Sequence, residues 1–221
     1  MFYFYGRKKR IVGEYPKPKY DTIIEPFSGS AAYACEYHDR NVIIVEKDKK
    51  ISTVWDFLIN ASDKDILGLP IVPKGESLND PKYAGFSDGE IWTVGLFLNP
   101  GSSTPKKSPG KFCKWDENMR AKLVLDARKV NHWKLIKDDY TMAPDIEATW
   151  YIDPPYQGNG GQYYMISNKH LDYVQLADWC RSRKGQIIVC ENSEADWMDF
   201  KPLIDIQGQK HKTKEVIWTN Q

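Results

Sequence analysis

The sequence predicts an α/β fold: a mostly parallel sheet covered by helices, with an antiparallel pair of strands at its C-terminal end. Three features lead to this prediction. Short runs rich in β-branched and aromatic residues alternate with stretches whose apolar residues recur at helical spacing. The apolar run 148–152 stops at an acid and two prolines, and proline cannot continue a central strand. Near the end of the chain, the strand patterns 203–206 and 215–219 follow each other without a helix between them.

Length and composition fit one globular domain with an insertion. The chain has 221 residues, of which 41% are hydrophobic and 28% are charged, so it can bury a sizeable core. No apolar run approaches the ~20 residues that a membrane span needs. No signal peptide is evident, so we expect a cytoplasmic protein. The cysteines, Cys35, Cys113, Cys180 and Cys190, form no CxxC pair, and we expect free thiols and no metal site.

The first quarter of the chain predicts two strand–helix units. A strand at 22–24 leads through small residues into a helix at 31–37, with Ser30 near its N-cap. A second strand, 41–46, ends in a glutamate and precedes a helix at 47–60. The turn after the first strand can present backbone N–H groups to a ligand. It lacks a GxGxxG pattern and a P-loop lysine, which disfavours a phosphate cradle. A carboxylate at the tip of the second strand can accept hydrogen bonds from both ribose hydroxyls.

The flanking stretches are less regular. The aromatic run 2–5, taken alone, favours an N-terminal strand with a basic solvated end. Residues 61–115 hold many prolines and glycines and only one long apolar piece, 91–98. A stretch this irregular inside a domain is usually functional or disordered, and we expect 102–110 to be mobile. A helix is predicted at 118–133.

The last third of the chain returns to alternating elements. A short strand begins at 135–136, and the strand 148–152 is followed by a glycine-rich loop, 158–161, expected to be mobile and able to close over a site. A helix is predicted at 168–183 and a buried strand at 186–190. The final antiparallel pair is expected to have a basic turn at 210–212.

The net charge of +1 hides an uneven distribution. Residues 1–20 carry six basic residues against one acid, a local charge of +5, and residues 100–134 carry nine against three, a local charge of +6. The rest of the chain is therefore at −10. Such asymmetry fits a polyanion bound on one face. Two solvated loops rich in lysine explain it equally well.

Five short stretches occur in an informative order. They are the aromatic segment with Gly6 and Lys8, residues 25–30 (Glu-Pro-Phe-Ser-Gly-Ser), Glu46, Asp139-Tyr140 and Asp153-Pro154-Pro155-Tyr156. Together they resemble the S-adenosylmethionine-dependent DNA adenine-N6 methyltransferases of the Dam-like class (D12, alpha order), which include phage members. The resemblance implies a Rossmann-like class I methyltransferase sheet. It further implies a catalytic, cofactor-binding domain at 1–60 and 134–221 and an inserted target-recognition region at 61–133.

The same resemblance implies S-adenosylmethionine as cofactor, duplex DNA as partner, and a bacterial or phage-infected cell as setting, with restriction–modification as one such role. The implied cofactor contacts are Tyr5, Gly6 and Lys8 at the methionine end, Phe27, Ser28 and Gly29 in the turn beneath the cofactor, Glu46 at the ribose hydroxyls, and Asp139 with Tyr140 at the adenine amino group. The sequence leaves open whether Lys8 or Lys9, and whether Asp138 or Asp139, makes these contacts. The implied DNA contacts are Lys106, Lys107, Lys111 and Arg120, of which arginine is the better base reader.

The chemistry explains why an acid, prolines and an aromatic residue belong together. The amino nitrogen of adenine is a poor nucleophile because its lone pair is delocalised into the ring. The Asp153 carboxylate and the Pro154 carbonyl can accept its two N–H groups and aim the lone pair at the methyl donor, with Pro155 keeping the turn stiff. Tyr156 offers a stacking face, worth ~1–3 kcal/mol per base. A base inside a duplex must first flip out.

The acceptor geometry serves any exocyclic amine. Methylation of cytosine N4 or of an RNA base therefore stays open beside adenine N6. A non-catalytic DNA-binding module with the same fold is a further alternative, which the intact acids at positions 46 and 153 disfavour.

Overall fold

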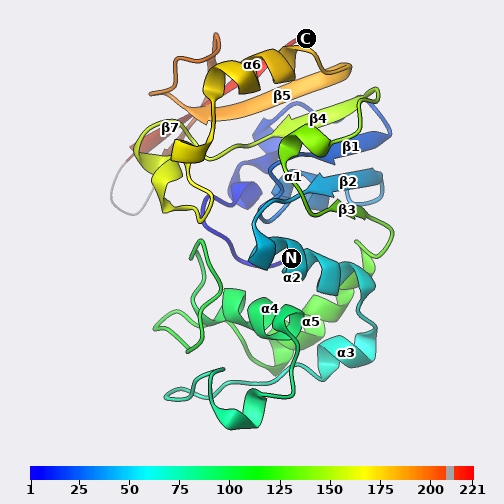
Figure 1. Ribbon diagram of the computed structural model, residues 1–221, viewed down its shortest axis with the longest axis vertical. Coiled ribbons are helices and arrows are strands. Elements are labelled where there is room, and N and C mark those ends of the chain that lie inside the picture. The colour runs from blue at the N-terminus through cyan, green and yellow to red at the C-terminus, as the bar shows by residue number, and fades with distance from the viewer. Residues whose placement is uncertain (208–211) are drawn as a thin grey trace.

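The computed structural model describes residues 1–207 and 212–221. Within these residues, seven strands form one sheet in the order β3-β2-β1-β4-β5-β7-β6 (Figure 1). The strands β1 to β5 run parallel, and β7 pairs antiparallel with both β5 and β6. This confirms the predicted α/β fold with an antiparallel C-terminal pair. The arrangement is typical of class I methyltransferases.

The elements have the following bounds. The strands are β1 (Thr22–Glu25), β2 (Asn41–Val45), β3 (Lys134–Ile136), β4 (Ala148–Ile152), β5 (Gly185–Asn192), β6 (Lys201–Gln207) and β7 (Lys212–Thr219). The α-helices are α1 (Ala32–Glu36), α2 (Lys49–Asn60), α3 (Asp63–Leu67), α4 (Asp88–Leu98), α5 (Glu117–Arg128) and α6 (Tyr173–Arg181). Short 3-10 helices are η1 (Lys8–Arg10), η2 (Val12–Glu14), η3 (Pro81–Tyr83), η4 (Tyr140–Met142), η5 (Asn159–Tyr163) and η6 (Asn168–His170).

Side chains on the central strands alternate between two cores, as a pleated sheet requires. Ile23 and Tyr151 belong to one hydrophobic cluster, which also takes residues from η2, α1 and α2. Ile24 and Trp150 belong to the other cluster, beneath α6 and η4. All five residues of β4 are buried, so the strand that leads to the acid at 153 is covered on both faces.

Three of the predictions at helix ends are wrong. Ser30 does not cap α1: the N-cap position is Ala31, which has a left-handed φ of 44° and makes no side-chain cap. The helix predicted from 168 begins at Tyr173, because the Asp172 carboxylate caps it and the residues before it form η6. The helix predicted to reach 133 ends at Arg128.

The N-terminal residues form no strand among the described elements. They run through a turn at residues 5 and 6 into η1 and η2, and the aromatic run anchors this segment to the core. Phe2 is fully buried, with its ring 5.2 Å from that of Trp55 in α2. Burial of large rings in the core, rather than pairing at a sheet edge, therefore explains the aromatic pattern of this segment.

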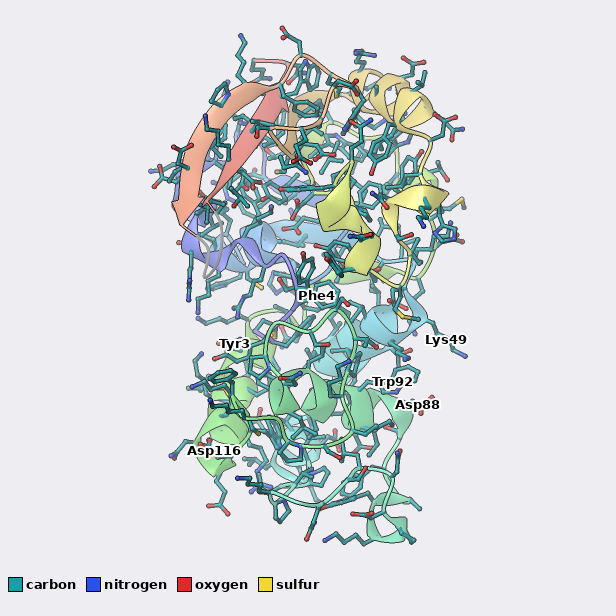
Figure 2. The ribbon with its side chains drawn as sticks, turned by 90° about the vertical axis from the view of Figure 1, so that its left-hand side faces the viewer. Tyr3, Phe4, Lys49, Asp88, Trp92 and Asp116 are labelled. Atoms are coloured by element: carbon teal, nitrogen blue, oxygen red, sulfur yellow. The ribbon has the colours of Figure 1, made fainter. Side chains whose placement is uncertain are left out.

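The segment 61–133 extends the molecule beyond the β3 edge of the sheet, with α2 between the sheet and the helices α3, α4 and α5 (Figure 1). Tyr3 and Phe4 lie at the junction between the two parts (Figure 2). The ring of Tyr3 contacts Phe97 of α4 edge-on, with centroids 5.8 Å apart. Phe97 and Leu123 share the hydrophobic cluster that underlies α2. The inserted segment is thus packed onto the sheet domain through a common core.

Within the described residues, no helix has the length and apolar character to cross a membrane. Two residues of the predicted basic turn, Lys210 and His211, lie outside the described residues.

Candidate functional site

The carboxyl ends of β1, β2 and β4 border a cleft of about 190 Å³. A parallel sheet of this kind places its ligand at this edge. All nine residues that the sequence assigns to the cofactor line the cleft. Lys8 lines it, whereas Lys9 is exposed and lines a separate cleft against α5. Asp139 lines it as well, and Asp138 does not.

The lining of this cleft is acidic. The acids are Glu25, Glu46, Asp48, Asp139, Asp153 and Asp172, and the bases are Arg7, Lys8 and Lys47. With every acid ionised and His170 neutral, the charge of the lining is −3. Burial raises the pKa of Glu25 well above its usual value, and with that acid neutral the charge is −2, still opposite in sign to the two basic segments of the chain. A cleft of this charge favours a ligand that brings positive charge and hydrogen-bond donors.

Glu46 directly follows the last residue of β2, and its carboxylate binds the turn that follows β1. One carboxylate oxygen accepts hydrogen bonds from the Gly29 N–H (2.8 Å) and the Ser28 hydroxyl (3.0 Å). The other oxygen accepts from the Asp48 N–H (2.9 Å) at the start of α2. Burial raises the pKa of Glu46 to about 7, although the two backbone N–H groups favour its ionised form. The acid is thus held in place before any ligand binds.

The turn after β1 is shaped by close packing. Gly29 has a φ of +45°, and a Cβ there would meet the Phe4 ring at 3.3 Å. Its carbonyl accepts a hydrogen bond from the Trp55 indole (2.8 Å). At the end of β1, the buried Glu25 carboxylate accepts from the Ala34 N–H (2.5 Å), and burial raises the pKa of Glu25 well above its usual value. Sequence reasoning did not single out Glu25, although an acid ending a buried strand was the signal that identified Glu46.

Asp139 stands at the start of η4 and closes the far end of the cleft. Its carboxylate accepts from the Thr141 N–H (3.1 Å) and pairs with the Lys47 ammonium (2.9 Å). Burial acts to raise the pKa of Asp139, but the hydrogen bonds from Lys47 and Thr141 outweigh it and the pKa falls below its usual value. Tyr140 stacks on Phe27, with ring centroids 5.1 Å apart. The two aromatic residues named by the sequence thus form one apolar wall.

The four residues of the turn after β4 do not all line the cleft. Asp153 and Pro155 line the cleft, whereas Pro154 and Tyr156 do not. The Pro155 carbonyl accepts a hydrogen bond from the Tyr173 hydroxyl of α6 (2.5 Å). Pro154 is buried, and among the hydrogen bonds of the described residues none is donated to its carbonyl.

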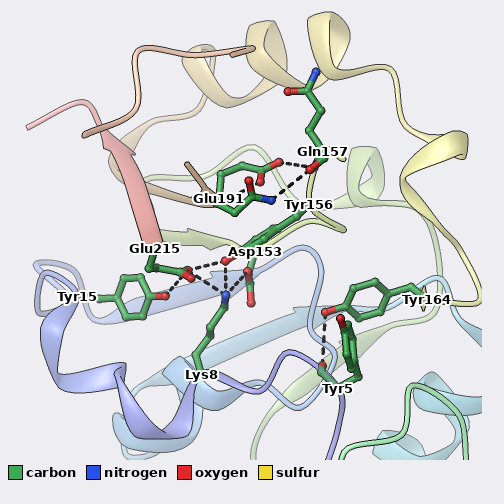
Figure 3. A network of polar contacts seen from close by, with 10 residues as sticks. Tyr5, Lys8, Tyr15, Asp153, Tyr156, Gln157, Tyr164, Glu191 and Glu215 are labelled. Atoms are coloured by element: carbon green, nitrogen blue, oxygen red, sulfur yellow. Dashed lines mark hydrogen bonds and ion pairs between the residues drawn. The ribbon is translucent and has the colours of Figure 1, made fainter. Parts of the chain in front are cut away.

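Asp153 lies beside a buried ionic network (Figure 3). The Lys8 ammonium is 2.9 Å from Glu215 Oε1 and 3.5 Å from Asp153 Oδ1. It also contacts the Tyr156 hydroxyl and lies 4.3 Å from the centre of that ring. The Tyr156 ring therefore packs against Lys8, and its hydroxyl donates to Glu215 (2.5 Å). The stacking role predicted for Tyr156 stays a prediction.

Two charges of opposite effect act on Asp153. Burial raises the pKa of its carboxyl to about 6, while the Lys8 ammonium favours ionisation and the Glu215 carboxylate opposes it. Potential metal-ligand atoms of Asp153, Cys190 and Glu215 lie within 4.8 Å of one another. The cation beside this cluster is the protein's own ammonium, and burial raises the pKa of the Cys190 thiol well above its usual value.

The segment between β4 and α6 covers one side of the cleft. Tyr164, Met165 and Ile166 line it, and sequence reasoning missed all three. The Tyr164 hydroxyl donates to the Tyr5 carbonyl (3.4 Å). A Cβ on Gly6 would lie 2.2 Å from that hydroxyl oxygen, which explains why glycine stands there with a φ of +72°. The paired tyrosines after a glycine-rich loop were the signal that could have marked this segment.

The basic residues of the insertion divide into two kinds. Lys106 and Lys111 are exposed and Lys107 is half-buried. Arg120 is half-buried and donates to the Leu69 carbonyl (2.8 Å), so its guanidinium is used in packing the insertion. The loop that carries the lysines contacts the N-terminal segment that lines the cleft, since the Tyr5 N–H donates to the Ser102 carbonyl (3.2 Å).

The comparisons with known proteins reveal structural likeness at low sequence identity. No protein-family model matches the chain, and no curated protein matches its sequence. Among solved structures, the chain is similar to the "Putative methyltransferase yhhF from Escherichia coli", at 8% identity and a TM-score of 0.38. The likeness covers 95% of this chain and 78% of that one.

Proposed function

We propose that the chain is an S-adenosylmethionine-dependent methyltransferase acting on the N6 amino group of a flipped-out adenine in DNA. One observation carries the proposal. The cleft at the carboxyl ends of β1, β2 and β4 has an acidic lining that includes both Glu46 and Asp153. Glu46 suits the donor molecule, and Asp153 suits the amine that receives the methyl group.

The residues of the cleft fit this cofactor by charge and by hydrogen bonding. S-adenosylmethionine brings a sulfonium cation, two ribose hydroxyls and an adenine amino group, all of which seek acceptors or negative charge. Glu46 and Asp139 would hold the hydroxyls and the amino group, and Phe27 offers an apolar face. A cofactor with phosphate groups would meet repulsion from the acids of this lining. When bound, S-adenosylmethionine supplies a methyl group that is ready for displacement.

The turn after β4 supplies the acceptors for the substrate. The Asp153 carboxylate lies in the cleft, and the Pro154 carbonyl makes no hydrogen bond within the described residues. Holding both N–H groups of an exocyclic amine there would aim the nitrogen lone pair at the methyl donor, and positioning of this kind lowers the barrier to displacement. The methylated nitrogen is acidic as a cation, so its proton can leave after transfer, and Asp153 need not act as a strong base.

A nucleic acid is supported by the basic loop of the insertion. Lys106, Lys107 and Lys111 belong to it, and its backbone bonds to the segment that lines the cleft. Phosphates bound by such lysines would bring a flipped base toward an acidic cleft that repels the backbone itself. The target-recognition role of residues 61–133 is part of this proposal.

Methyl transfer is the decisive test. The protein is incubated with labelled S-adenosylmethionine and unmethylated duplex DNA, and the labelled nucleoside is identified after digestion. N6-methyladenine supports the proposal, while N4-methylcytosine, or label in RNA alone, moves the activity to another amine. DNA binding without transfer by protein that binds the cofactor would identify a non-catalytic module. Asp153→Ala, which should bind cofactor but transfer nothing, is the matched inactive control.

A further inference from the structure

The Lys8 ammonium is shared unequally between two carboxylates. An ammonium has three N–H donors. Lys8 directs one to Glu215 at 2.9 Å and another to the Tyr156 hydroxyl, and its distance to Asp153 is 3.5 Å. The side chain of Lys8 is only 10% exposed, so water does not screen this competition well. Lys8 therefore makes its shorter ion pair with Glu215 and its longer one with Asp153.

Glu215 is built to hold that ammonium. It lies on β7, opposite Asn192 of β5, and is 3% exposed. The oxygen that contacts Lys8 also accepts from the Tyr15 hydroxyl (2.7 Å) and the Tyr156 hydroxyl (2.5 Å). Three donors on one buried oxygen leave little freedom to move, because each bond to a charged acceptor is worth ~1.5–3 kcal/mol.

We propose that Glu215 is a positioning residue that draws the Lys8 ammonium away from Asp153, so that an Asp153 oxygen stays available to accept an N–H of the substrate amine. Without a carboxylate at 215, the buried ammonium would pair fully with Asp153, the remaining carboxylate within its reach. That ion pair would occupy the acceptor and compete with the amine. The identity of the amine rests on the proposed function, but the competition between the two carboxylates does not.

The consequence is a change in the titration of Asp153. A full ion pair with Lys8 favours the ionised carboxylate, and loss of the like charge at 215 acts in the same direction. Glu215→Gln should therefore lower the pKa of Asp153, which burial sets at about 6 in the native protein. The titratable groups that face Asp153 are Lys8, Tyr15, Glu25, Tyr151, Tyr156, Tyr164, Cys190, Glu191 and Glu215.

The test is a carboxyl-carbon NMR titration of the protein without ligands, with the Asp153 signal assigned by its loss in Asp153→Asn. We expect the Asp153 pKa to fall by about one pH unit in Glu215→Gln, the scale of shift that one close charge produces. In a Lys8→Met background the same substitution should lower it clearly less, because only the direct charge effect remains. Equal shifts in the two backgrounds, or no shift in either, would overturn the proposal.

Two further variants keep the test decisive. Glu191→Gln removes another buried carboxylate near Asp153, one that binds the Gln157 N–H (2.6 Å) instead of Lys8, and should shift the pKa less. An equal shift would mean that Glu215 acts by charge alone and would refute the positioning role. If Glu215→Gln does not fold, Glu215→Asp keeps the charge and shortens the reach. It should still lower the pKa of Asp153, and an unchanged pKa would refute the role.

The titration separates this inference from the proposed function. A protein that transfers no methyl group can still show the shift, which would leave the role of Glu215 standing and the proposed function refuted. In an active enzyme, Glu215→Gln should also raise KM for DNA by about tenfold, as expected for loss of one good hydrogen bond. A lower kcat with unchanged KM and unchanged pKa would indicate a merely structural role.

Discussion

Replacing Glu46 by glutamine tests the cofactor end of the cleft most directly. The carboxylate already accepts from the Gly29 and Asp48 N–H groups, so its position is fixed before a ligand arrives. Glutamine keeps the shape but removes the charge. Hydrogen bonds to a charged acceptor are worth ~1.5–3 kcal/mol. If Glu46 holds the ribose hydroxyls, the Kd for S-adenosylmethionine should rise ~10–150-fold.

The pH dependence sharpens this prediction. Burial raises the pKa of Glu46 to about 7, so about one tenth of the protein carries the ionised acid at pH 6 and about nine tenths at pH 8. Affinity for S-adenosylmethionine should therefore rise by about tenfold between these values in the native protein. It should rise less in Glu46→Gln. Calorimetric titrations at pH 6, 7 and 8 measure the affinity of the native protein and of Glu46→Gln. The variant Glu147→Gln, at an exposed position, is a control with the same change of charge.

Stability should change with pH in the opposite direction. The folded pKa of Glu46, about 7, lies above the unfolded value of 4.5, so the folded protein binds more protons between the two. This group alone therefore makes stability fall as pH rises from 4.5 to 7, with no further change above. Thermal melts of Glu46→Gln should show a smaller fall over that window.

Equal pH dependence of affinity in native protein and variant would refute the ribose assignment and the raised pKa together.

Three other predictions concern the substrate acceptor, the glycine under the tyrosine segment and the basic loop. Asp153→Asn should lower kcat by ~10–150-fold with cofactor affinity unchanged, since it weakens an acceptor for the amine; unchanged turnover in single-turnover assays would contradict it. Gly6→Ala should destabilise the protein by ~1–3 kcal/mol in denaturant titrations because of its positive φ and the crowded Cβ, whereas Gly13→Ala, with nothing within 4 Å, should be neutral. Lys106→Gln and Lys111→Gln should each reduce the salt slope of DNA binding by ~0.9 if each contacts a phosphate, and an unchanged slope would remove these lysines from the interface.

The fold was predictable because its signals are local. The run 148–152 matches β4 in full, since its aromatic and β-branched residues are followed by an acid and two prolines that cannot continue the strand. Boundaries failed where a side chain or a turn outweighed the pattern. Asp172 caps α6, which begins at Tyr173, five residues after the predicted start at 168. The aromatic run 2–5 looks like a strand by composition, but Phe2 is buried against Trp55, a contact that spans 53 positions.

The lining of the cleft was predictable where a residue follows a strand. Phe27, Glu46 and Asp139 each follow a strand, and the parallel sheet brings the ends of those strands to one edge. A residue of the lining that does not directly follow a strand was missed. Tyr164 reaches the cleft from a segment whose path no periodicity predicts. Glu25 ends β1 and carries the same signal as Glu46, although its carboxylate accepts from the Ala34 N–H inside the fold.

Glu215 shows why a sequence motif underdetermines a site. Its contact with Lys8 joins positions 207 residues apart, and the sequence around either residue does not predict a contact with the other. The contact exists because β7 is antiparallel between β5 and β6, which brings a residue of the last strand beside the acid that follows β4. The antiparallel strand therefore does more than complete the sheet. It supplies the second carboxylate for which Lys8 is the shared cation, and so governs whether Asp153 is an open acceptor or half of an ion pair.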